Sequence, residues 1–173
     1  MADNIRDIIL GGQDGLVNVL GLVLGVAAAT MDTRTIIISG LAGTFAESIS
    51  MAAVTYTGFK AARDVGKRKY KNHHAKKYLM TEYGKPFTSA IVVGISSLLG
   101  SILPIISFFA LPVEQAMYSS VIIAIIVLFI IGSTKGILAR QEWYKTGIEM
   151  AIIGTIAALA GFIVGEILKK IFI

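Results

Sequence analysis

The sequence predicts an all-α, polytopic membrane protein with five transmembrane helices. Hydrophobic residues make up 55% of the 173 positions, and the mean hydropathy is +0.75. The apolar residues lie in long runs, and roughly 20 such residues suffice for a helix to cross a bilayer. Charged residues gather between the runs. We therefore expect residues 1–173 to form a single transmembrane domain.

Five apolar runs can be placed along the chain. The first is the least hydrophobic, because Gln13, Asp14 and Asn18 lie in its first half. Pro104 interrupts the third, where a proline is expected to kink a helix. The fifth ends in a lysine pair that follows Glu166, which can pair with Lys169 or Lys170. The predicted spans are about 8–30, 36–59, 87–111, 117–139 and 148–168.

Glycines in the first run have the four-residue spacing that lets helix backbones approach closely in lipid. The pairs are Gly11 with Gly15, and Gly21 with Gly25. From this glycine-rich face, and from polar groups in the same run that need a partner or a pore, we expect a homodimer.

Lysine and arginine predict the orientation in the membrane. Residues 60–86 contain nine of them, against the acidic residues Asp64 and Glu82. The positive-inside rule then places this segment and the N-terminus in the cytoplasm. The segment is expected to attract anionic lipid rather than nucleic acid. The first seven residues lack the basic region of a signal peptide, so the first run is expected to stay in the protein.

Composition and motifs also exclude several functions. The chain has no cysteine, which rules out disulfides and thiolate metal sites. It contains no nucleophile–base pair and no phosphate-binding loop, so we expect neither an enzyme nor a resident cofactor.

The second run carries a carboxylate near its middle. Glu47 is costly at that depth unless it faces protein, water or an ion. Met51 lies one helical turn later, on the same face. An oxygen and a sulfur ligand together favour a divalent transition metal over calcium or magnesium. In the alternative interpretation, Met51 only packs and Glu47 only pairs with a neighbouring helix.

The first two runs are joined by a short turn, so they are expected to be antiparallel neighbours. Asp14 then lies about 9 Å inside the cytoplasmic boundary, at a depth similar to that of Met51. Asp14, Asn18, Glu47 and Met51 can converge there. Two carboxylates in a low dielectric repel, and one takes up a proton unless a cation lies between them. Such competition between proton and metal is the physical basis of an antiporter.

Two motifs resemble the vacuolar iron transporter family. The first run contains Asp14-Gly15-Leu16-Val17 followed by Gly21-Leu22-Val23-Leu24-Gly25, and the second contains Gly40-Leu41-Ala42-Gly43 leading to Glu47-Ser48-Ile49-Ser50-Met51. The resemblance implies a homodimer with a pore between subunits. It also implies proton-coupled export of ferrous iron, with manganese and cobalt left open. Asp14 and Met51 match the pore aspartate and methionine of the family.

The chain departs from the family pattern in two places. Plant members place the pore glutamate directly after Gly-Leu-Ala, where this chain has Gly43, and Glu47 is one turn away. The carboxylate-rich cytoplasmic metal-binding domain is missing from residues 60–86, whose other candidate ligands are His73, His74 and Met80.

The predicted metal site therefore consists of Asp14, Glu47 and Met51, with Asn18 and Glu149 as weaker candidates. The membrane would be the cell membrane in a prokaryote and a vacuolar-type membrane in a eukaryote. A non-transporting membrane dimer or a metal sensor built on the same helices is the alternative function.

Overall fold

The computed structural model describes residues 2–69 and 83–172, and these form five long helices. They are α1 (Ala2–Thr30), α2 (Thr33–Lys69), α4 (Pro86–Ala110), α5 (Val113–Leu138) and α6 (Trp143–Phe172). Each helix is long and apolar enough to cross a membrane. The predicted all-α class is thereby confirmed, and the five helices are candidate membrane spans.

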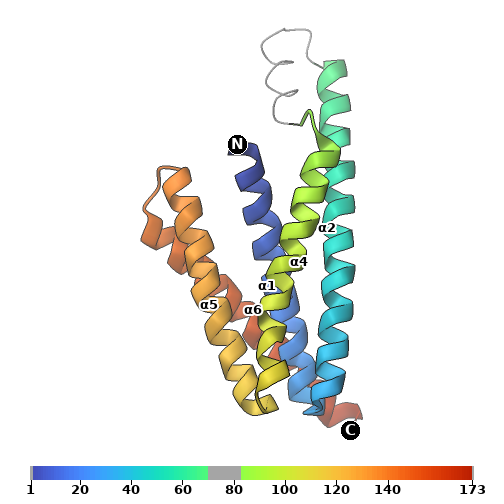
Figure 1. Cartoon of the computed structure of the whole chain (residues 1–173), viewed down its shortest axis with the longest axis vertical. Helices are drawn as coiled ribbons and strands as arrows, with labels where there is room; N and C mark the ends of the chain where they lie inside the picture. The colour runs from blue at the N-terminus through green and yellow to red at the C-terminus, as the bar shows by residue number, and fades with distance from the viewer. Residues whose placement is uncertain (1, 70–82, 173) are drawn as a thin grey trace.

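Helix α2 is longer than the sequence analysis predicted. It continues past residue 59 to Lys69, because residues 60–69 contain no proline and are mostly good helix formers. The first ten residues of the expected loop 60–86 are therefore helical, and Figure 1 shows α2 extending beyond the other helices at that end. His73, His74 and Met80 lie outside the described residues. Helix α4 starts at Pro86 and runs through the buried Pro104 as one element.

Helix α1 lies at the centre of the bundle, with α2 and α4 beside it and α6 crossing it obliquely (Figure 1). Its glycines set how closely these neighbours approach. A Cβ added at Gly11 or Gly15 would overlap backbone carbonyl oxygens of α4, and one added at Gly25 would lie 2.9 Å from the carbonyl oxygen of Gly161 in α6. Both glycine pairs of α1 therefore pack within the same chain. These contacts occupy the glycine face on which the expected homodimer was partly based, and the homodimer stays a prediction.

The turn between α1 and α2 is fixed by Asp32, the residue before the first residue of α2. One carboxylate oxygen of Asp32 accepts hydrogen bonds from the backbone nitrogen of Thr35 at 2.8 Å and from its hydroxyl at 2.6 Å. This is the geometry of a helix N-cap. The hydrogen bonds from Thr35 hold the pKa of Asp32 below its usual value. The tight turn makes α1 and α2 antiparallel neighbours, as predicted.

Candidate ion site between helices α1 and α2

Asn18 links two carboxylates that lie on different helices. Its amide nitrogen donates to Oδ2 of Asp14 at 3.3 Å and to Oε1 of Glu47 at 2.9 Å. Asp14 is one turn earlier in α1, whereas Glu47 belongs to α2. Both carboxylates are half-buried, and Asn18 is exposed. A single amide group thus holds two acidic side chains together within the membrane-spanning part of the protein.

Residues of α1 and α2 also lie opposite each other one helical turn to either side of this link. One turn toward the end of α1, the side chain of Leu22 lies against Gly43, where an added Cβ would overlap its Cδ2 atom. One turn the other way, antiparallel geometry sets Met51 level with Asp14. Met51 is half-buried, four residues after Glu47 on the same helix.

The structure therefore brings together Asp14, Asn18 and Glu47, as the comparison of depths predicted. Metal binding by these residues and by Met51 remains a prediction. Glu149 is exposed in the second turn of α6, and its carboxylate forms no hydrogen bond or ion pair with any other described residue. The structure thus does not link Glu149 to the carboxylate pair.

The carboxylate pair lies on an open face of the chain. Asn18 is exposed there and Leu22 is 39% exposed, so the described helices leave this face partly uncovered. Ionised groups on a lipid-facing surface are costly and normally face protein or water. Among residues 2–69 and 83–172, no group of three histidine, aspartate or glutamate side chains could hold a metal ion. The described residues therefore bring two carboxylates together here, not three.

A groove of about 570 Å³ begins beside this site and was not anticipated from the sequence. It starts at Gly21 and Leu22, one turn beyond Asn18, and follows α1 toward Thr30. Helix α2 contributes Thr35 and Ser39, and α6 contributes the other wall. The repeated small residues of α6, at positions 161 and 165, were the signal in the sequence that could have predicted its close approach to α1.

Five membrane-spanning helices and a carboxylate pair held by an amide within two of them define a class. They are the features of a polytopic membrane protein with a polar site inside the membrane.

Comparison with known proteins identifies the family. A model of the VIT family matches residues 5–77 and 67–166, so the chain belongs to this family. An uncharacterized protein of Methanocaldococcus jannaschii is 31% identical to this chain. The alignment covers 96% of this chain and 89% of the relative. Vacuolar iron transporter 1 of Eucalyptus grandis is 25% identical, and its alignment covers 91% of this chain and 84% of the relative. The family is one of transporters, which confirms that the chain is not an enzyme.

The lengths of the alignments distinguish two kinds of relative. The alignment with the Eucalyptus protein spans 208 residues, although it includes only 91% of this 173-residue chain. About 50 of its positions therefore hold residues of the plant protein alone. The alignment with vacuolar iron transporter homolog 1 of Arabidopsis thaliana spans 159 residues for the same share of this chain. The chain is thus a short member of the family, as predicted.

Proposed function

We propose that this protein exports a divalent transition metal, ferrous iron first among them, from the cytoplasm in exchange for protons. The observation that carries the proposal is the position of Asn18, which holds Asp14 and Glu47 within reach of one amide nitrogen. Two carboxylates that share a site in a low dielectric favour either a bound cation or a bound proton. Metal and proton would therefore compete for the same two carboxylates, as exchange requires. The names of the plant relatives support iron as the cargo.

The working unit is a homodimer in this proposal. Its support is the partly uncovered face that carries Asn18 and Leu22, together with the two carboxylates that one chain brings together there. A second copy related by a two-fold axis presents the same face, since a symmetric dimer interface uses one patch on both subunits. Two copies then supply four carboxylates and two methionine sulfurs around one axis. Oxygen and sulfur ligands together suit ferrous iron.

The path of the ion follows from the groove beside the site. Along α1, the carboxylate pair comes before Leu22. The groove runs from Leu22 toward Thr30. Leu22 covers Gly43 between them, which forms an apolar step along the proposed path. An apolar step that opens only when metal or protons are bound would prevent uncoupled leakage. Hydroxyl groups of Thr35 and Ser39 line the groove beyond this step.

The test is flux in proteoliposomes loaded with a metal-sensitive dye. The wild-type protein, Asp14→Asn and the control Asp32→Asn are compared with ferrous, manganous and cobaltous ions under an imposed pH gradient. We expect ferrous flux in the wild type and the control, and inhibition when protons are added on the cytoplasmic side, because protonated carboxylates do not ligate metal. Metal binding without any flux would favour a sensor. Flux that ignores the pH gradient would contradict exchange for protons.

A further inference from the structure

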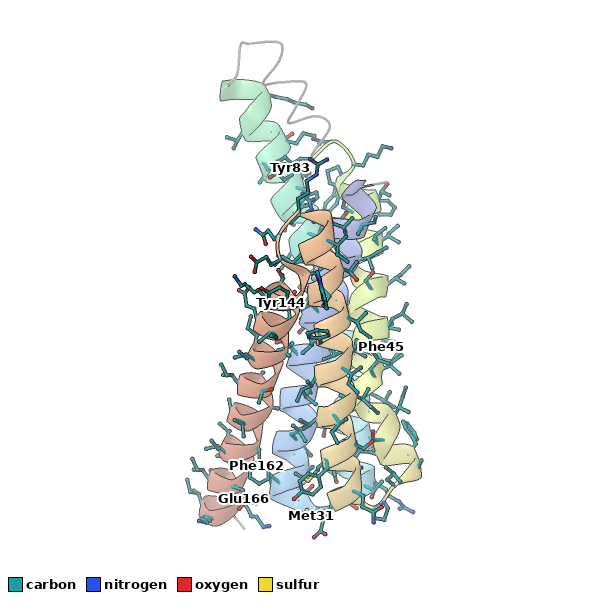
Figure 2. All side chains as sticks on the ribbon, turned by 90° about the vertical axis from the view of Figure 1, so that its left-hand side faces the viewer. Met31, Phe45, Tyr83, Tyr144, Phe162 and Glu166 are labelled. Atoms are coloured by element: carbon teal, nitrogen blue, oxygen red, sulfur yellow. The ribbon has the colours of Figure 1, made fainter. Side chains whose placement is uncertain are left out.

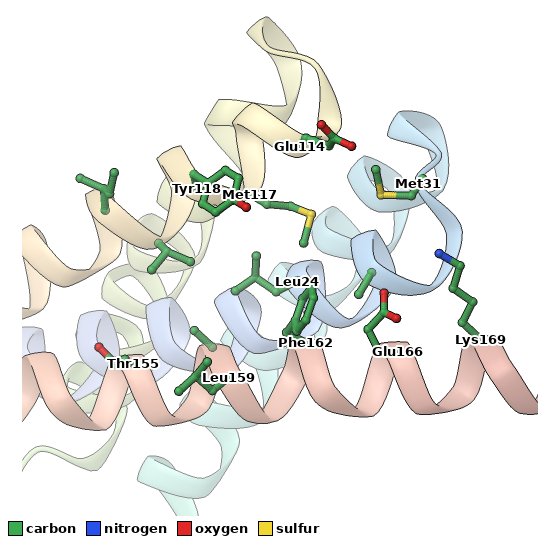
Figure 3. Close-up of a pocket in the computed structure, with 14 residues that line it drawn as sticks. Leu24, Met31, Glu114, Met117, Tyr118, Thr155, Leu159, Phe162, Glu166 and Lys169 are labelled. Atoms are coloured by element: carbon green, nitrogen blue, oxygen red, sulfur yellow. The ribbon is translucent and has the colours of Figure 1, made fainter.

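A second, larger cavity lies away from the ion site. Its volume is about 770 Å³, and it is enclosed by the end of α1, the start of α5 and the last part of α6 (Figure 3). Its lining is mostly apolar and includes Leu24, Leu159 and Phe162. Glu114, Glu166 and Lys169 lie toward one end of it, which we call the charged end (Figure 3). Figure 2 shows Phe162, Glu166 and Met31 at the same end of the helix bundle. The volume falls within the range of pockets that bind small molecules.

Part of the cavity lining is exposed on the side of the helix bundle, where candidate membrane spans would meet hydrocarbon. Three of its lining residues are largely exposed apolar or aromatic side chains: Tyr118 at 75%, Ile122 at 58% and Leu159 at 55%. In a membrane-spanning bundle such side chains face lipid. Because apolar surface of this kind favours hydrocarbon over water, the occupant is expected to enter from the bilayer with an acyl chain.

The side chains at the charged end have no polar partner within the described part of the chain. Within residues 2–69 and 83–172, the side chains of Glu114, Glu166 and Lys169 form no ion pair or hydrogen bond with another residue. The sequence-based pairing of Glu166 with Lys169 is therefore not formed. Two carboxylates and one ammonium group at the end of an apolar cavity complement a headgroup that carries both a cationic amine and a phosphate.

We propose that this cavity binds a phospholipid with a primary-amine headgroup, of the phosphatidylethanolamine type. The acyl chain packs against Leu24, Leu159 and Phe162, the ammonium group lies against the carboxylates, and the phosphate lies against Lys169. A primary ammonium donates three hydrogen bonds to carboxylates, as lysine does, whereas the quaternary amine of choline donates none. An anionic headgroup without an amine is repelled by Glu114 and Glu166.

This lipid site is separate from the proposed path of the metal. The face of α6 that carries Gly161 and Gly165 packs against α1. Residues Val164 and Leu168 line the groove near the ion site, whereas Leu159 and Glu166 line the lipid cavity. The two spaces therefore lie on different sides of α6. The lipid proposal stands whether or not the protein exports metal.

Native mass spectrometry of the purified full-length protein tests the proposal. The protein is titrated in mild detergent with ethanolamine, choline and glycerol phospholipids that have identical acyl chains. We expect the ethanolamine lipid to be retained most strongly. The double variant Glu114→Gln with Glu166→Gln should reduce its preference over the glycerol lipid by about fivefold, the scale of one exposed charge pair. The control Glu142→Gln alters a carboxylate near the other end of α6 and should keep the preference.

A second variant tests the cavity itself. Leu159→Trp places a larger side chain in the cavity and should reduce retention of all three lipids, whereas Ile156→Trp, at an exposed position of α6 outside the cavity, should not. Thermal unfolding in detergent checks that both variants remain folded. Equal retention of the three lipids by the wild type would mean unselective lipid contact only and would overturn the proposal. Unchanged retention in a folded Leu159→Trp variant would place the lipid elsewhere.

Discussion

The amide nitrogen of Asn18 lies 2.9 Å from Oε1 of Glu47, a residue 29 positions later in the chain. The same nitrogen lies 3.3 Å from Oδ2 of Asp14. Because an amide group has two N–H donors, Asn18 can serve both carboxylates at once. It neutralises part of their mutual repulsion without adding a charge. This contact decides which substitutions in the proposed ion site are informative.

Asp14→Asn should reduce ferrous flux by at least about tenfold, since a charge-assisted interaction contributes 1.5–3 kcal/mol. The substitution keeps the shape of the side chain and removes its charge, so folding should survive. Flux in proteoliposomes and thermal unfolding of the same preparation measure both effects. Wild-type flux in this variant would contradict a metal site at Asp14.

Asn18→Leu should weaken metal binding although Asn18 carries no charge. Without the amide bridge the two carboxylates repel, and Asp14 and Glu47 are expected to move apart. A positioning residue should therefore raise the metal concentration needed for half-maximal flux more than it lowers the maximal flux. Asn18→Gln, which retains an amide group, should recover part of the affinity. Equal behaviour of the Leu and Gln variants would show that the bridge is unimportant.

Leu22 and Gly43 should be energetically coupled. Gly43→Glu alone introduces a side chain into the space that Leu22 fills, so it should lower the thermal stability. Combining it with Leu22→Ala frees that space and restores the glutamate of the plant pattern. We expect a coupling free energy of about 0.5–3 kcal/mol in a double-mutant cycle of unfolding. Additive effects of the two substitutions would disprove the contact.

Met51→Leu should distinguish between metals. Leucine has a similar size but lacks the thioether, which favours softer ions. Ferrous flux should therefore fall more than manganous flux, whereas Asp14→Asn should reduce both. Competition between the two metals in one proteoliposome assay gives the ratio directly. An unchanged ratio would remove Met51 from the proposed ligand set.

Asp32 should give the protein a pH-dependent contribution to stability. Its pKa is lowered in the folded protein by hydrogen bonds from Thr35, so the stabilisation is complete above the ordinary pKa of aspartate and is lost as the pH falls through the lowered value. Asp32→Ala should thus unfold more readily than the wild type at pH 7, and the difference should shrink on acidification below about pH 4. Asp32→Asn, which can cap but does not titrate, is the control. A difference between Asp32→Ala and the wild type that does not vary with pH would contradict this role of the carboxylate.

The sequence by itself determined the five helices, because long apolar runs have few ways to satisfy their backbone hydrogen bonds in lipid. It also determined that α1 and α2 are antiparallel, because a short turn permits nothing else. The level of Asp14 relative to Glu47 then followed from the rise per residue. The proposed pairing of two carboxylates could therefore be predicted from residue positions alone.

Only the tertiary structure decided how the faces of the helices are used. The glycine pairs of α1 have the spacing of a dimer interface, yet they contact α4 and α6 of the same chain. Spacing shows that a backbone can be approached closely but does not say by which helix. The role of Asn18 as a bridge, the contact of Leu22 with Gly43 and the cavity at Glu166 likewise depend on the rotation of each helix about its axis. That rotation is set by side-chain packing among all five helices at once.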